Sequence, residues 1–171
     1  LLNGGSGNDT LYGDAGNDTI FGEDGNDTIG AGSEDDSVWG GAGNDTYLYN
    51  SGDGADVILD HDGHWVGQDY VMDSNVLNFG ANVDAANVTA KLDRNSGQVY
   101  LDLGNGDSIN IGTTTDLAVQ FIQFVDGSSW YTPYLLNNLL IEANPNALPD
   151  AALPLSLDTA ITYTATLADG T

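Results

Sequence analysis

The sequence has no cysteine and only two basic residues, Lys91 and Arg94, among 171 residues. The absence of cysteine rules out disulfides and thiolate metal sites, and it fits both a secreted and a cytosolic protein. Against the two bases stand 26 acidic residues, which gives a formal net charge of -24 and a pI near 4.1. Nucleic acids and anionic membrane surfaces are therefore poor partners, because both are bound through basic patches.

Glutamate is also scarce, since only Glu23, Glu34 and Glu142 interrupt an otherwise all-aspartate set of acids. Aspartate favours turns and coordinates hard cations, whereas a merely solubilising acidic surface usually contains both acids. Residues 1–73 hold sixteen acids and no Lys or Arg. A compact domain with that charge repels itself unless something neutralises it. No apolar stretch approaches the ~18 residues that a membrane-spanning helix needs.

From residue 4 the sequence divides into five successive nonapeptides: GGSGNDTLY, GDAGNDTIF, GEDGNDTIG, AGSEDDSVW and GGAGNDTYL. Each has an aspartate at its sixth position and an apolar or aromatic residue at its eighth. The aspartates are Asp9, Asp18, Asp27, Asp36 and Asp45, and the eighth-position residues are Leu11, Ile20, Ile29, Val38 and Tyr47. A partial sixth copy, residues 51–59, follows after a two-residue insertion.

Each position of the repeat has a physical role. Glycine lets the backbone adopt positive φ in a tight turn and leaves carbonyl oxygens exposed. The aspartate supplies a carboxylate, and the eighth residue points inward from a short strand. The threonine that follows four of the aspartates suits a β conformation. The run therefore predicts an all-β solenoid of short strands and acidic turns.

These nonapeptides resemble the repeats-in-toxin (RTX) family, whose consensus is GGxGxDxUx. The resemblance implies a parallel β-roll in which two nonapeptides complete one coil and Ca²⁺ lies between repeats n and n+2. It implies four ligand pairs, one ion for each, or about four ions: Asp9 with Asp27, Asp18 with Asp36, Asp27 with Asp45, and Asp36 with Asp56. The full implied ligand set, turn carbonyls included, is Gly4, Ser6, Asp9, Gly13, Ala15, Asp18, Gly22, Asp24, Gly25, Asp27, Asp36, Gly41, Gly43, Asp45, Gly52, Asp53, Gly54 and Asp56.

The fourth repeat departs from the consensus, with Ala31 and Glu34 in place of two glycines. Glutamate resists positive φ, so we expect either a distorted turn or an extra carboxylate from Glu34 or Asp35. Without a counter-ion the whole acidic run is expected to be disordered, and calcium binding and folding should then be one event.

The segment from residue 60 to 131 alternates apolar and polar residues in runs at 88–92, 99–103 and 109–111, which predicts half-buried antiparallel strands. Residues 119–124 read as a buried strand that Trp130 closes. The segment resembles the hemolysin-type calcium-binding related domain, through residues 52–56, 77–80, 104–109 and 124–130. Such a domain would cap the open end of the roll.

Residues 60–73 are expected to form a loop with a peripheral Ca²⁺ bound by Asp53, Asp60 or Asp62. Its two histidines, His61 and His64, raise a zinc interpretation. The lack of cysteine and the oxygen-rich surroundings favour a hard cation instead, with the histidines packed beside Trp65.

Beyond Thr132-Pro133 we expect a short helix, then a proline-containing linker at 142–155 and a strand at 160–167. Residues 158–170 weakly resemble the first strand of dystroglycan-type cadherin-like or Ig-like modules. An isolated strand of this kind would add to a sheet edge of its own chain or of a neighbour. The predicted domains are thus a roll at 1–59, a cap at 60–131 and a tail at 132–171.

No nucleophile, zinc-protease or phosphate-loop motif occurs, so catalysis is not expected. The leading hypothesis is a calcium-binding folding module of an RTX protein, and the resemblance implies a bacterial, extracellular protein exported by type I secretion. The sequence starts with residues that match the end of a repeat, so we expect a fragment of a longer protein. The alternatives are a surface-layer, adhesin or filament subunit, and a polysaccharide-binding module stacking sugars on Tyr12, Phe21, Trp39, Tyr47 and Tyr49.

Overall fold

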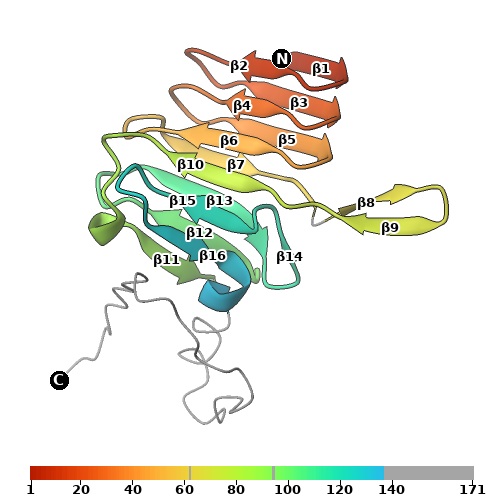
Figure 1. Cartoon of the computed structure of the whole chain (residues 1–171). Helices are drawn as coiled ribbons and strands as arrows, with labels where there is room; N and C mark the ends of the chain where they lie inside the picture. The colour runs from red at the N-terminus through yellow and green to blue at the C-terminus, as the bar shows by residue number, and fades with distance from the viewer. Residues whose placement is uncertain (62, 94, 137–171) are drawn as a thin grey trace, which may run out of the picture.

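A computed structural model describes residues 1–61, 63–93 and 95–136. Its strands form two facing sheets and one separate hairpin (Figure 1). The eight-stranded sheet contains β1 (Leu2–Ser6), β3 (Thr19–Asp24), β5 (Ser37–Ala42), β7 (Ala55–Ile58), β13 (Ser108–Thr113), β12 (Gln98–Asp102) and β11 (Thr89–Leu92), with β14 (Asp116–Leu117) beside β13. The six-stranded sheet contains β16 (Ser129–Tyr131), β15 (Phe121–Gln123), β10 (Val76–Phe79), β6 (Thr46–Tyr49), β4 (Thr28–Gly30) and β2 (Thr10–Tyr12).

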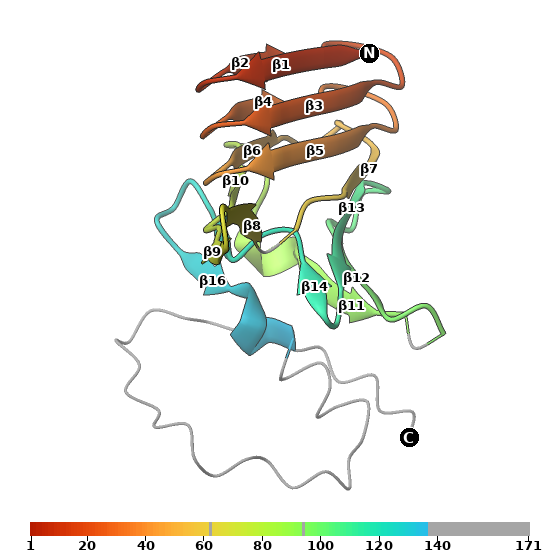
Figure 2. The same ribbon diagram turned by 90° about the vertical axis from the view of Figure 1, so that its right-hand side faces the viewer.

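Successive repeats alternate between the two sheets, so that each coil consumes two nonapeptides. Ile20 pairs in parallel with Val38 in one sheet, and Leu11 pairs with Ile29 in the other. Both pairs are separated by 18 residues, and Figure 2 shows the resulting coils stacked one on another. The expected all-β parallel roll is therefore confirmed.

The core lies between the sheets and is built from the eighth-position residues. Ile20, Ile29, Val38 and Tyr47 are buried there because strand alternation turns every second side chain inward. Pairing on the eight-stranded sheet extends from the strand residues into the turns. In β3 and β5 the turn residues 22–24 and 40–42 also keep the parallel register.

The cap continues both sheets of the roll rather than packing on them as a separate body. β10 pairs in parallel with β6 and then with β15, and β13 pairs in parallel with β7. The antiparallel strands expected around residues 88–111 are present as the β11–β12–β13 meander. In both sheets, strands after residue 59 pair directly with strands before it. The structure therefore shows no break at this point, and the domain limit at 59/60 stays a prediction.

The expected loop at 60–73 is wrong: β8 (Gly63–Val66) and β9 (Asp69–Met72) form an antiparallel hairpin that projects from the sheets (Figure 1). His64 Nδ1 lies 2.7 and 2.9 Å from the two carboxylate oxygens of the buried Asp73, which fixes the base of the hairpin. The short turn at Gly67, where φ is 67°, joins the two strands.

Residues 132–136 are helical, as expected for the start of the tail. The Thr132 hydroxyl donates to the Val119 carbonyl, and Leu135 is buried, so this turn of helix is docked on the cap. The linker, the strand at 160–167 and the weak resemblance at 158–170 lie outside the described residues. Within the described ranges, no helix has the length and apolarity needed to cross a membrane.

Candidate metal centre

The sixth-position aspartates form two ladders along the edges of the roll. In the first ladder the amide of Asp9 donates to Asp27 Oδ1 at 2.8 Å, and the amide of Asp27 donates to Asp45 Oδ1 at 2.8 Å. In the second, the amide of Asp18 donates to Asp36 Oδ1 at 2.6 Å, and the amide of Asp36 donates to Asp56 Oδ1 at 2.9 Å. The fold thus brings together the members of all four predicted pairs, including the one that spans the two-residue insertion.

The second carboxylate oxygen of most ladder residues is buried without a hydrogen-bond donor among the described residues. This holds for Oδ2 of Asp9, Asp27, Asp36, Asp45 and Asp56. Asp27, Asp36, Asp45 and Asp56 are only 1%, 2%, 0% and 3% exposed. A buried carboxylate oxygen that accepts nothing costs several kcal/mol unless a cation or a proton neutralises it. The ladders therefore fit a row of bound cations.

Backbone carbonyls approach the same oxygens across the coils. A Cβ atom placed on Gly4 would lie 2.9 Å from Asp9 Oδ2 and 2.9 Å from the Gly22 carbonyl oxygen. On the other ladder, a Cβ on Gly13 would lie 3.1 Å from Asp18 Oδ2 and would overlap the Ala31 carbonyl oxygen. Only glycine leaves this space open. An all-oxygen set of carboxylates and carbonyls is the donor set that Ca²⁺ prefers.

The predicted ligand set does not include the carbonyls of Ala31 and Gly40, and in the fifth repeat it has Gly41 instead. A Cβ on Gly22 would overlap both Asp27 Oδ2 and the Gly40 carbonyl oxygen, so Gly40 repeats the part that Gly22 plays one coil earlier. The signal was available, because both residues occupy the first position of a nonapeptide, as Gly4, Gly13 and Gly22 do.

Other predicted turn residues connect successive coils. The carbonyl of Asp24 accepts a hydrogen bond from the Gly7 amide at 2.7 Å, and the Gly25 amide donates to Ala42 at 2.8 Å. The remaining positions of the turns pair in the same parallel register: Ser6 with Asp24, Ala15 with Ser33, and Glu23 with Gly41. The glycines at the fourth position keep positive φ, with 133° at both Gly25 and Gly43.

The irregular fourth repeat keeps the turn of its neighbours. Glu34 adopts φ of 85°, so the expected distortion does not occur, and the strain is carried by a glutamate. The next coil packs directly on this turn, because a Cβ on Gly54 would lie 2.5 Å from the Glu34 carbonyl oxygen. Asp35 Oδ1 accepts the Ala55 amide at 3.1 Å, so this carboxylate supports the following turn.

The partial sixth repeat places Asp53 and Asp60, two of the residues predicted for a peripheral Ca²⁺, at opposite ends of β7. Asp53 Oδ2 accepts the Asn50 amide at 2.7 Å and caps a turn before β7, whereas Asp60 follows β7 at its opposite end. Gly52 donates its amide to Asp107 Oδ2 at 2.6 Å. Asp62 lies outside the described residues. Asp53 and Asp60 therefore do not share one ion, and a peripheral Ca²⁺ on either of them separately stays a prediction.

The two histidines contact different carboxylates, His61 that of Asp116 at 2.8 Å and His64 that of Asp73. Across residues 1–61, 63–93 and 95–136, no three His, Cys, Asp or Glu side chains gather as a metal-binding group. A zinc centre of that kind is not formed there. The arrangement this part of the chain offers is a carboxylate pair completed by backbone oxygens.

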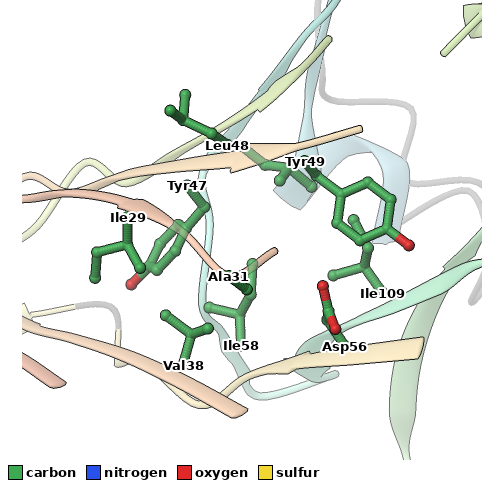
Figure 3. A pocket seen from close by; sticks show the side chains of 10 residues that line it. Ile29, Ala31, Val38, Tyr47, Leu48, Tyr49, Asp56, Ile58 and Ile109 are labelled. Atoms are coloured by element: carbon green, nitrogen blue, oxygen red, sulfur yellow. The ribbon is translucent and has the colours of Figure 1, made fainter. Parts of the chain in front are cut away.

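Burial raises the pKa of four ladder carboxyls, those of Asp27, Asp36, Asp45 and Asp56, and neighbouring carboxylates raise it further. The pKa of Asp45 and of Asp56 is raised to about 7, and the pKa of Asp27 and of Asp36 is also raised. Figure 3 shows the apolar surroundings of Asp56, which faces a cavity lined by Tyr49, Ile58 and Ile109. A divalent cation would reverse these shifts by favouring the charged form.

The five aromatic residues of the polysaccharide-binding alternative do not share one exposed surface. Tyr47 and Tyr49 are buried in the core, so these two rings cannot stack on a sugar and the polysaccharide-binding alternative loses them. Phe21 and Trp39 stack on each other with ring centroids 4.7 Å apart, which covers one face of each ring. Tyr12, on the other sheet, is exposed.

Comparison with known proteins agrees with this geometry. The family model of the RTX calcium-binding nonapeptide repeat, which describes four copies of the repeat, matches residues 1–29 and again residues 24–58. No curated protein matches the chain. The matched residues are those that carry both aspartate ladders, and the repeat family is a structural calcium-binding module rather than a catalytic one. Residues 1–58, which form the parallel β-roll, thus match the RTX calcium-binding nonapeptide repeat family.

Proposed function

We propose that the roll binds about four Ca²⁺ ions between its coils and that this binding drives its folding. The observation that carries the proposal is the row of buried Oδ2 oxygens in the aspartate ladders. Each ion would lie between two coils at one of the four predicted pairs. It would receive oxygen from a ladder carboxylate and from first-position carbonyls such as those of Gly22 and Gly40.

Charge supports the coupling of binding to folding. Residues 1–73 carry sixteen acids without Lys or Arg, and four divalent cations would cancel about half of that charge. Stacking the coils in the absence of cations brings like charges into buried contact, which the unfolded chain avoids. The free energy of calcium binding then becomes free energy of folding.

The setting in which such a module works is an environment rich in calcium. We infer a secreted or cell-surface bacterial protein in which the chain leaves the cell unfolded, through a type I system, and folds on meeting external calcium. Affinities of about 10⁻⁴–10⁻³ M would suit that role, since extracellular calcium modules are often that weak. The cap, residues 60–131, would supply the folded end on which the coils stack.

Circular dichroism against calcium concentration tests the proposal. The metal-free chain should lack most of its β signal, and the signal should rise cooperatively with calcium and vanish on addition of EDTA. A chain that shows the full β signal in EDTA, unchanged by calcium, would refute the coupling. Magnesium at the same concentrations is the control, because its octahedral, water-retaining coordination suits this carbonyl-rich set poorly.

A further inference from the structure

The last level of the first ladder, at Asp45, has a different set of neighbouring oxygens from the levels before it. At Gly22 the neighbouring oxygens are Asp27 Oδ2 and a turn carbonyl of the next coil. At Gly40, one coil further, they are Asp45 Oδ2, the hydroxyl of Tyr47 and Asp60 Oδ2, which lies 2.6 Å from where a Cβ would be. The side chain of Asp60 thus takes the place that a backbone carbonyl occupies elsewhere in the ladder.

Asp60 is held firmly in this place. Its Oδ1 accepts the amides of Gly41 at 3.2 Å and His61 at 2.9 Å. Its Oδ2 accepts the Asn75 side-chain amide at 2.8 Å and the Tyr47 hydroxyl. The carboxylate is 6% exposed, so these four donors orient it before any ligand arrives.

Asp45 Oδ2 points into the same space and has no hydrogen-bond donor within the described part of the chain, on a side chain that is fully buried. Asp73, 4% exposed, lies close enough to repel both Asp45 and Asp60 electrostatically. The nearby His64 ring already contacts Asp73, and Lys91 pairs with Asp102 far along the cap. The Asp45 and Asp60 carboxylates therefore share a buried space with Asp73 nearby, and the cationic side chains His64 and Lys91 pair with other carboxylates.

We propose that Asp45 and Asp60 bind a further Ca²⁺ at the junction between the roll and the cap, in addition to the ions between the coils. This junction site lies one coil, about 4.8 Å, beyond the Asp27–Asp45 pair. The Tyr47 hydroxyl can turn its hydrogen away from Asp60 and present its own oxygen. The ion would join β5, β6 and the segment after β7, so that the last coil and the cap are fixed together.

The Asp60→Asn variant tests the junction site, because it keeps the shape of the side chain and removes its charge. We expect one fewer calcium bound per chain in equilibrium dialysis at saturating calcium, with the far-ultraviolet dichroism of the wild type. The matched control is Asp69→Asn on the exposed hairpin strand β9, which should bind as many ions as the wild type. A folded Asp60→Asn protein with undiminished stoichiometry would overturn the proposal.

Anomalous diffraction from wild-type crystals grown with calcium or terbium tests whether an ion occupies the junction site even if Asp60→Asn does not fold. We expect a peak between Asp45 Oδ2 and Asp60 Oδ2, about 2.3–2.6 Å from each for calcium. Peaks between the coils with none at the junction would mean that the two carboxyls share a proton, and the junction site would be wrong while the proposed function stands. A map with no peaks at all would instead contradict the proposed function.

Discussion

The amide of Asp45 donates a hydrogen bond to the side-chain oxygen of Asn75 at 2.8 Å, in the position where the amide of Asp27 donates to Asp45. The backbone amide of Asn75 donates in the same way to Gln120 Oε1 at 2.7 Å. The carboxylate ladder thus continues into the cap as a ladder of amides. Asn75 Nδ2 also donates to Asp60 and to the Ala118 carbonyl, so this level satisfies its acceptors with N–H groups.

Replacing Asn75 by aspartate should destabilise the calcium-loaded protein by about 3 kcal/mol. The change removes two buried hydrogen-bond donors and adds a negative charge beside Asp45 and Asp60, and each effect costs about 1–3 kcal/mol or more. Urea unfolding at saturating calcium measures it. Asn82→Asp, the same change at an exposed position, should be within about 0.5 kcal/mol of the wild type. Equal midpoints for the two variants would show that Asn75 does not end the ladder.

The roll could be predicted from the sequence because its contacts recur at a fixed distance along the chain. Asp27 and Asp45 are 18 residues apart, as are Ile20 and Val38, so a single period gives register, core and ligand pairs together. Even Glu34, which breaks the glycine pattern, keeps the turn because the coils on both sides hold it in place.

The end of the roll could not be predicted in this way, because its contacts have no common period. Asn75 lies 30 residues after Asp45, and Gln120 lies 45 residues after Asn75. The β8–β9 hairpin and the antiparallel meander separate them, so no periodic signal marks either amide as a ladder residue. The sequence predicts Asp60 as one possible ligand of a peripheral Ca²⁺, but its position opposite Asp45 follows only from the fold.

Asp27→Asn should be the most damaging of the conservative ladder substitutions. Asp27 belongs to two predicted pairs: its side chain accepts the Asp9 amide of the preceding coil, and its own amide donates to Asp45 of the following coil. We expect the calcium midpoint of folding to rise at least tenfold, equivalent to about 1.4 kcal/mol. Calcium titration followed by circular dichroism measures the shift. Asp24→Asn keeps the backbone carbonyl that bonds to Gly7 and alters an exposed side chain, so it should leave the midpoint unchanged.

Stability without calcium should fall as the pH rises, which is the reverse of the calcium-loaded form. The folded-state pKa of Asp45 and of Asp56 is raised to about 7, against an ordinary value of 3.8, because burial disfavours the charged form. The folded state thus binds more protons than the unfolded state between these values, so its stability is greatest below pH 4 and is lost as the pH approaches 7.

In EDTA, the β signal should therefore be larger near pH 4 than at pH 8. In calcium, acidification below pH 7 should instead weaken binding, because the ion needs deprotonated carboxylates. Paired dichroism titrations between pH 4 and pH 8, with EDTA and with calcium, test both signs. Parallel pH profiles under the two conditions would show that the ladder carboxyls are not the groups that respond.

Gly22→Ala should prevent the roll from closing at its centre. A methyl group there would overlap both Asp27 Oδ2 and the Gly40 carbonyl oxygen, the two oxygens proposed to face the same ion. Overpacking of this kind costs about 1–3 kcal/mol, and displacement of a ligand oxygen adds to it.

The chain supplies its own control at the equivalent position of the fourth repeat, where Ala31 already carries a methyl group that faces the core cavity (Figure 3). Ala31→Gly should cost about 1 kcal/mol and leave the number of bound ions unchanged, whereas Gly22→Ala should lose at least one ion in equilibrium dialysis. If Gly22→Ala binds as many ions as Ala31→Gly, the oxygens around Gly22 do not form a calcium site.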